Sequence, residues 1–145
     1  MESQDNKLFS DVFEIVEKDK GGKKFDRVSR IQGRSENYEM DLTLDVNTEI
    51  YPIEIGEKYA LMLASSLSLD GTDKIEIWRD QSKSSLADDY DYVMYGKVFK
   101  YDDSNGSKVA IYVSYGGLLM CLEGDYRHLQ NIEVGKCIYL LMRKN

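Results

Sequence analysis

Apolar and polar residues alternate along much of this chain with a period of two, the spacing that a β-strand imposes on a half-buried surface. The clearest run is 40–47, where Met40, Leu42, Leu44 and Val46 alternate with polar residues. We predict a strand there, with one face in the core and one in water. Less regular runs predict further strands at residues 12–17, 25–32, 59–65, 92–100, 109–123 and 137–142.

Two of these runs, YVMYGKVFK and VAIYVSYGGLLMCLE, flank a turn that contains an Asn-Gly pair, which tolerates the positive φ angles of a tight reversal. Neither run alternates cleanly. Tyr92 and Met94 share one face of the first run, and Val93 and Tyr95 share the other. A strand with one face in water should carry polar residues on that face, so we predict that these strands are covered on both faces.

The segments between strands predict little helix. Gly116-Gly117 interrupts the second run without the helix or Lys-Ser/Thr pair of a phosphate loop, so we interpret it as a bulge or bend within one strand. Residues 68–89 predict a long loop, mobile rather than functional, with a short strand or helical turn near 85–89. Residues 126–131 predict a short helical stretch with Asp125 as its N-cap.

Many short strands at spacings of about 8–12 residues predict an all-β fold, an antiparallel barrel that is closed or nearly closed. The chain has 145 residues, which fits a single domain over 1–145. Its polar start and the absence of an apolar run of about 20 residues predict neither a secretory signal nor a membrane span.

Residues that could support catalysis are few. The chain has one histidine, His128, and two cysteines, Cys121 and Cys137, which lie in apolar runs without paired spacing. We interpret the histidine as a surface residue and the cysteines as free core thiols in a reducing compartment, with one disulfide as the alternative. We therefore predict no catalytic residues, no metal, no cofactor and no small-molecule substrate.

One segment differs in charge from the rest of the chain. Residues 18–34 carry seven basic and two acidic side chains, a net charge of +5 in a chain whose total is −7. Basic residues next to an aromatic ring are typical of a surface that binds single-stranded nucleic acid. A solvated strand edge and an anchor for an acidic protein are the alternatives. The candidate nucleic-acid-binding residues are Lys18, Lys20, Lys23, Lys24, Phe25, Arg27, Arg30 and Arg34.

Five segments of the chain form a recognisable set. They are GGKKFDRVSR (21–30), LTLDVNTEIYP (42–52), LADDYDYVMYGKVFK (86–100), YVSYGGLLMCLEGDYR (112–127) and YLLMRK (139–144). Together, in this order and over nearly the whole chain, they resemble a known family, the eighth subunit of the nuclear DNA-directed RNA polymerases, which polymerases I, II and III share. The sequence departs from the family pattern at Gly21-Gly22, where many relatives have an acidic or proline-containing turn, and at Cys121, where a basic residue is frequent.

The resemblance implies an OB-fold-like barrel of about eight antiparallel strands, with one long omega-type loop and a short helical turn. It implies a non-catalytic subunit in the nucleus, held mainly against the largest polymerase subunit, which carries the active-site metal. It also implies weak, sequence-independent binding of single-stranded DNA by the segment after the first strand. That segment is residues 16–40 here, and it contains the basic residues named above.

Strands that are apolar on both faces leave a barrel with an apolar outer wall. That wall must be exposed, covered by the loop at 68–89 or covered by a partner, and large exposed apolar patches are rare on monomers. We predict that a partner covers part of it, since interfaces favour aromatic residues. The candidate anchors are Tyr92, Met94, Tyr95, Tyr112, Tyr115 and Leu118.

Three classes of function are consistent with these features. The first is a non-catalytic polymerase subunit that supports assembly, with weak nucleic-acid contact as a secondary property. The second is an autonomous single-strand-binding module, whose tight and salt-sensitive binding would fall when Lys23, Lys24 and Arg27 are neutralised. The third is a ligand-carrying barrel, which a core crowded with Leu, Met and Tyr disfavours. We favour the first class.

Overall fold

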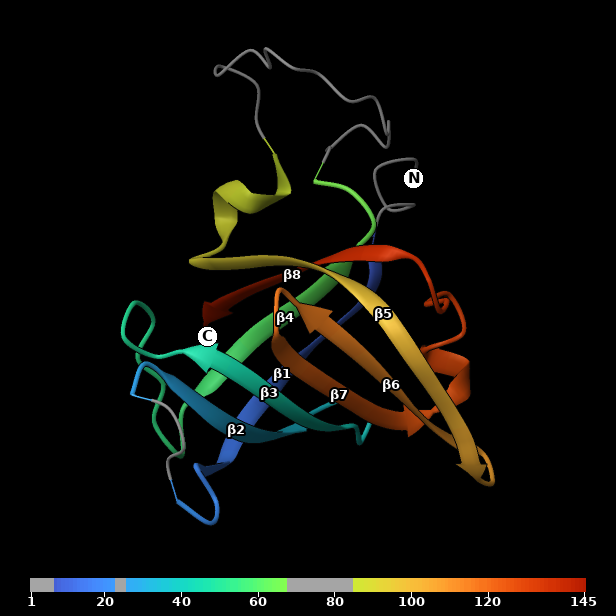
Figure 1. Cartoon of the computed structure of the whole chain (residues 1–145), viewed down its shortest axis with the longest axis horizontal. Helices are drawn as coiled ribbons and strands as arrows, with labels where there is room; N and C mark the ends of the chain where they lie inside the picture. The colour runs from blue at the N-terminus through green and yellow to red at the C-terminus, as the bar shows by residue number, and fades with distance from the viewer. Residues whose placement is uncertain (1–6, 23–25, 68–84) are drawn as a thin grey trace.

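The computed structural model describes residues 7–22, 26–67 and 85–145, and these residues form eight strands and two short 3-10 helices (Figure 1). The elements, in chain order, are β1 (Lys7–Lys18), β2 (Val28–Ser35), β3 (Asp41–Asn47), β4 (Lys58–Ala64), η2 (Leu86–Asp89), β5 (Tyr92–Asn105), β6 (Lys108–Tyr115), β7 (Leu118–Asp125), η3 (Tyr126–His128) and β8 (Cys137–Lys144).

All eight strands pair in one antiparallel sheet that closes on itself. Their order around the barrel is β1-β2-β3-β7-β6-β5-β8-β4, and β4 returns to pair with β1. A closed barrel leaves no strand edge for unwanted pairing. The predictions of an all-β fold and of a closed antiparallel barrel with about eight strands are confirmed.

The predicted single strand at 109–123 is wrong. It is a hairpin of two strands, β6 and β7, in which Tyr115 pairs with Leu118. Gly116 and Gly117 form the two-residue turn between them, with φ angles of 64° and 104°. Two successive positive φ angles are what a tight hairpin requires, and glycine adopts them without steric cost. The interpretation of this pair as a bulge or bend is therefore corrected.

Other predicted strands are placed correctly but with shifted ends. The first begins at Lys7 rather than at residue 12, the second runs over 28–35 rather than 25–32, and β5 continues to Asn105, through most of the predicted turn. The predicted helical turn near 85–89 is η2, and the second helical stretch is η3. Its N-cap is Asp125, as predicted, with a side chain that accepts from the Arg127 N–H at 2.9 Å.

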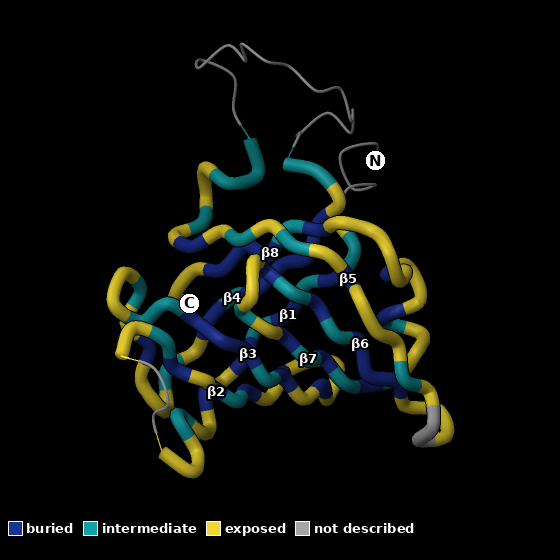
Figure 2. The backbone as a smooth tube through the Cα atoms, viewed as in Figure 1, coloured by how far each residue is buried: buried dark blue, intermediate teal, exposed yellow. Residues whose placement is uncertain are grey.

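The core fills the inside of the barrel. Alternate residues of every strand point inward, and the largest fully buried side chains include Phe13, Leu44, Leu61, Ile111 and Leu122. Figure 2 shows this alternation of buried and exposed positions along the strands. Such side chains pack against one another as one core.

A second, smaller cluster lies outside the barrel. Met62 and Ala64 of β4 and Leu141 of β8 point outward, yet they are buried. They are covered by partly buried side chains that include Leu86, Ala87 and Tyr90. These three lie on and just after η2, so part of the outer wall is covered by the chain itself. The rest of the predicted loop, residues 68–84, lies outside the described residues.

Glu57 links the loop before β4 to the end of β8. Its carboxylate accepts hydrogen bonds from Lys144 Nζ at 2.7 Å and from the Tyr59 hydroxyl at 2.6 Å. These bonds lower the pKa of Glu57 to about 2, and the bond from Lys144 has the largest effect. A carboxyl with a lowered pKa stabilises the fold above its ordinary pKa of 4.5, and this contribution is lost as pH falls toward 2.

We therefore expect Glu57→Gln to reduce stability at neutral pH and to weaken its pH dependence between about 4.5 and 2. Urea unfolding of both proteins across this range measures the difference. The matched control is Glu133→Gln, an exposed change of the same charge. If Glu57→Gln and the parent protein lose stability in parallel as pH falls, Glu57 is not responsible.

Candidate partner and nucleic-acid surfaces

The outer faces of β8, β5, β6 and β7 lie side by side and are rich in aromatic side chains. The strand register aligns three rows of outward side chains across it: Tyr139 and Tyr95; Cys137, Lys97, Ser114 and Leu119; and Lys100, Tyr112 and Cys121. Phe99 lies beside the third row. We call this surface the aromatic wall, and it includes the exposed length of β5 seen in Figure 2.

A bulge in β5 shapes the aromatic wall. The pairing of β5 with β6 shifts between Val98 and Lys100, which leaves Phe99 as an extra residue. Because of this shift, Phe99 and Lys100 are both exposed although they are adjacent in sequence. The bulge therefore adds one aromatic ring and one amine to the outer surface.

The rings of the aromatic wall pack against one another across strands. Tyr95 and Tyr139 have ring centroids 4.5 Å apart, and Phe99 and Tyr112 have theirs 6.2 Å apart. The side chains nevertheless remain open to solvent, with Tyr95 55% exposed and Phe99 50% exposed. A surface of this kind resembles the apolar centre of a protein–protein interface.

The six predicted anchors divide into three groups. Tyr92 and Tyr115 are buried in the core, with exposures of 7% and 5%. Met94 and Leu118 are half-buried and pack against that core. Only Tyr95 and Tyr112 have side chains in the aromatic wall. Sequence reasoning did not propose four further outward residues as anchors: Val93, Phe99, Leu119 and Tyr139.

Both cysteines lie on the aromatic wall, and both are free thiols. Cys137 is exposed and Cys121 is half-buried, so the prediction of core thiols is wrong. The alternation of β7 and β8 directs these side chains outward. Burial raises the pKa of the Cys121 thiol, and its hydrogen bond with Tyr112 raises the pKa of the Tyr112 hydroxyl.

The basic segment lies at the end of β1, on β2 and on the connection between them. Lys23, Lys24 and Phe25 lie outside the described residues, and Lys20 is exposed in the β1–β2 connection. The other four candidates each have a carboxylate partner from β3 or the loop after it. The pairs are Lys18–Glu54 at 3.4 Å, Arg27–Glu49 at 3.3 Å, Arg30–Asp45 at 2.6 Å and Arg34–Asp41 at 2.7 Å.

Asp45 makes the most constrained of these pairs. Its carboxylate accepts from Arg30 Nε at 2.6 Å and from Arg30 Nη2 at 3.0 Å, a bidentate geometry that also raises the pKa of Arg30. It further accepts from the Leu119 N–H at 3.0 Å, so it joins β2, β3 and β7. The Arg30 guanidinium is therefore held by the fold and is a poor candidate for phosphate binding.

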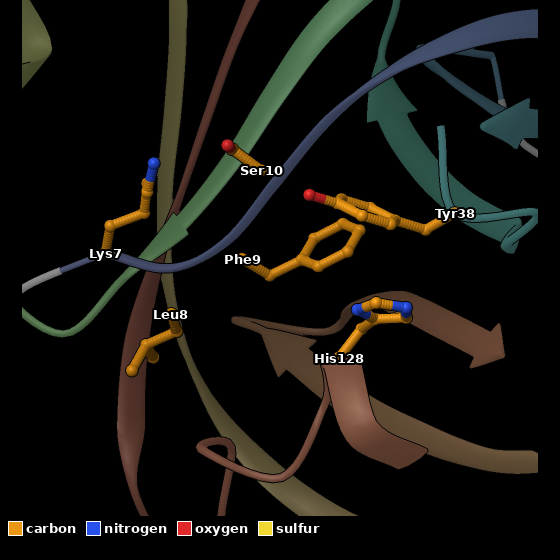
Figure 3. Close-up of a pocket in the computed structure, with 6 residues that line it drawn as sticks. All are labelled: Lys7, Leu8, Phe9, Ser10, Tyr38 and His128. Atoms are coloured by element: carbon orange, nitrogen blue, oxygen red, sulfur yellow. The ribbon is translucent and has the colours of Figure 1, made fainter. Parts of the chain in front are cut away.

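The single histidine closes a chain of rings rather than a metal site. The centroid of its ring lies 4.3 Å from that of the Tyr38 ring, and the Tyr38 centroid lies 6.0 Å from that of Phe9 (Figure 3). These rings, together with Lys7, Leu8 and Ser10, line an open pocket of about 170 Å³. Within residues 7–22, 26–67 and 85–145, no three His, Cys, Asp or Glu side chains gather as metal ligands would.

No helix in the same residues is long and apolar enough to cross a membrane.

Comparison with known proteins gives a consistent family. Residues 10–144 match the family described as RNA polymerase Rpb8. A protein of Dictyostelium discoideum named as DNA-directed RNA polymerases I, II, and III subunit rpabc3 is 55% identical over 138 residues, which cover 94% of this chain and 96% of that protein.

Two further relatives align over comparable lengths. An Arabidopsis thaliana protein named as DNA-directed RNA polymerases II, IV and V subunit 8B is 45% identical, over 94% of this chain and 95% of its own. The Saccharomyces cerevisiae protein named as DNA-directed RNA polymerases I, II, and III subunit RPABC3 is 40% identical, over 96% of this chain and 99% of its own.

Proposed function

The chain belongs to the RNA polymerase Rpb8 family, and on this premise we propose that it is a non-catalytic subunit that supports the assembly of nuclear RNA polymerases by packing on their largest subunit. The relatives named above are subunits of polymerases I, II and III or of II, IV and V. A subunit shared by several such enzymes acts through contacts that these enzymes have in common.

The observation that carries the assembly role is the aromatic wall. The η2 segment covers the outer faces of β4 and β8, but Tyr95, Phe99 and Leu119 remain 40–55% exposed. Contiguous apolar surface of this kind marks an interaction site on a soluble protein. Packing this wall on a larger subunit would remove it from water, and the gain in free energy would favour the assembled complex.

The test is affinity purification of the tagged chain from nuclear extract, with the polymerase subunits counted by mass spectrometry. We expect polymerase subunits in stoichiometric amounts with the parent chain. Tyr95→Asp and Phe99→Asp should each lower that yield, because each removes an aromatic ring that the partner would cover. Absence of polymerase subunits from the parent preparation would refute the proposal.

We infer a weaker second property, contact with single-stranded DNA by the basic segment. Four of its cations are already paired with carboxylates, and each phosphate would have to displace one of these carboxylates. Exposed pairs are worth about 0.2–1 kcal/mol each, so the competition weakens binding without preventing it. The chain would then bind DNA weakly by itself and more fully where an assembly holds the two together.

This competition makes a specific prediction. We expect Glu49→Gln and Glu54→Gln each to raise the affinity for an oligo-dT strand by about two- to fivefold at low salt, because each substitution frees one cation. Fluorescence anisotropy across a salt series measures the affinity. Glu133→Gln makes the same charge change far along the chain and should have a smaller effect. Equal affinities for all of these proteins would show that the pairs do not restrain binding.

A further inference from the structure

We propose that the aromatic wall binds a polymerase segment that presents carboxylates among apolar side chains, and that Lys97 and Lys100 are the amines that bind those carboxylates. This inference rests on the proposed function, to which it adds the chemistry of the partner. Both lysines lie on the wall, and neither forms an ion pair with a described carboxylate.

Both lysines lie within the apolar surface rather than at its rim. Lys97 pairs with Cys137 on one side and with Ser114 on the other, in the middle row of the wall. Lys100 pairs with Tyr112, and its Nζ lies 5.1 Å from the centre of the Tyr112 ring. The ring holds this amine close to the surface. A partner that covers the rings will therefore also cover the amines.

Among the described residues, most of the other Lys and Arg side chains have an acidic partner. The described ion pairs include Lys58 with Glu36, Arg127 with Asp125 and Lys144 with Glu57. Among the described residues, no carboxylate forms such a pair with Lys97 or Lys100. Burial of an unpaired ammonium is strongly unfavourable, so a purely apolar partner would bind this wall poorly. A partner that supplies carboxylates at these two positions avoids that cost.

Two other occupants fit the surface less well. A second copy of the chain in a two-fold arrangement would bring the same lysines toward each other, which is electrostatically unfavourable. A nucleic acid could stack on the rings, but the next outward row carries Asp102, Glu123 and Asp41. A phosphate backbone that follows the wall would meet these carboxylates. A short apolar protein segment whose carboxylates reach only Lys97 and Lys100 would cover the centre of the wall without extending over this acidic row.

The first experiment uses the native cysteines as reporters, since the chain has only two and both lie on the wall. Purified polymerase that contains the chain, and the free chain, are treated with iodoacetamide, and the cysteine peptides are quantified. We expect Cys137 to react in the free chain and at least about tenfold more slowly in the complex. Cys121 should react slowly in both, because burial raises the pKa of its thiol. Denatured complex should react fully at both.

The second experiment tests the amines. The double variant Lys97→Glu, Lys100→Glu should lower polymerase retention at least about tenfold, since like charges would face each other. The matched variant Lys97→Arg, Lys100→Arg keeps both charges and should be retained. Circular dichroism of the free variants checks their fold. Carbodiimide treatment of the parental complex should join Lys97 or Lys100 to an Asp or Glu of another polymerase subunit.

The outcomes separate the two proposals. If the chain does not co-purify with polymerase, the proposed function fails. If it co-purifies while Cys137 stays reactive, or if the glutamate variant is retained like the parent, the partner chemistry proposed here is wrong and the assembly role stands. Cross-links between two copies of the chain would identify self-association instead. Protection of Cys137 that disappears on nuclease treatment would identify nucleic acid, and either result overturns this inference.

Discussion

Gly96→Ala is expected to destabilise the barrel by about 3 kcal/mol, the upper part of the range for overpacked cores. Gly96 lies in β5 and packs closely against β6. A Cβ at this position would lie 2.2 Å from the Ser114 carbonyl oxygen and 2.6 Å from Cδ1 of Tyr115. The carbonyl belongs to the backbone of β6, and the Tyr115 ring is 5% exposed, so neither has room to move.

Urea unfolding of the free chain measures this effect as a lower midpoint. Gly33→Ala is the matched control, since Gly33 also lies in a strand but its Cβ would meet its nearest atoms at 3.4 Å. We expect Gly33→Ala to change stability by no more than about 1 kcal/mol, the scale of the backbone entropy difference between glycine and alanine. If both variants unfold at the same urea concentration, the close approach of β5 and β6 is not limiting.

Asp11→Ala should also cost about 3 kcal/mol, through lost hydrogen bonds rather than a clash. The Asp11 carboxylate is 6% exposed and holds the turn between β2 and β3. It accepts from the Val12 N–H at 2.7 Å, from the backbone and side-chain N–H groups of Asn37 at 3.3 and 2.7 Å, and from the Tyr38 N–H at 3.2 Å. Its removal leaves these donors without an acceptor in a partly buried place, and each such loss is worth about 1 kcal/mol or more.

Urea unfolding measures the stability of Asp11→Ala, and nuclear magnetic resonance of the His128 ring protons reports on the turn. Those protons lie against the Tyr38 ring, with the centroids 4.3 Å apart, and should shift when the turn loosens. Asp41→Ala removes an exposed carboxylate from the same region and should cost less than about 1 kcal/mol. An Asp11→Ala protein with parental stability and unchanged His128 signals would contradict this role.

The barrel could be predicted from the sequence because the alternation that marks a strand is a pattern among neighbouring residues. Alternation at 40–47 predicts one buried and one wet face. In β3, Leu42, Leu44 and Val46 lie in the core, whereas on the outer face Asp41 is exposed and Asp45 is buried. The hairpin at Gly116-Gly117 was missed because apolar residues continue on both sides of it. An apolar run that no cluster of polar residues interrupts looks like one strand, although a pair of glycines is also a strong turn signal.

The candidate surfaces were predicted less completely, because they depend on which strands become neighbours. The segment 18–34 is basic in sequence, but the partners Asp41, Asp45 and Glu49 come from β3 and the loop that follows it. The inward or outward direction of Tyr95 and Tyr115 likewise depends on the register and on the end of β6. Neither property follows from composition or spacing within one segment.

The position of β8 has a consequence for synthesis. It pairs with β4 on one side and with β5 on the other, and it follows every other strand in the chain. Until β8 leaves the ribosome, β4 and β5 each present an unpaired edge, and the growing chain holds an open sheet with its apolar interior accessible. We therefore expect nascent or truncated chains that lack β8 to require chaperone protection, whereas the completed barrel does not.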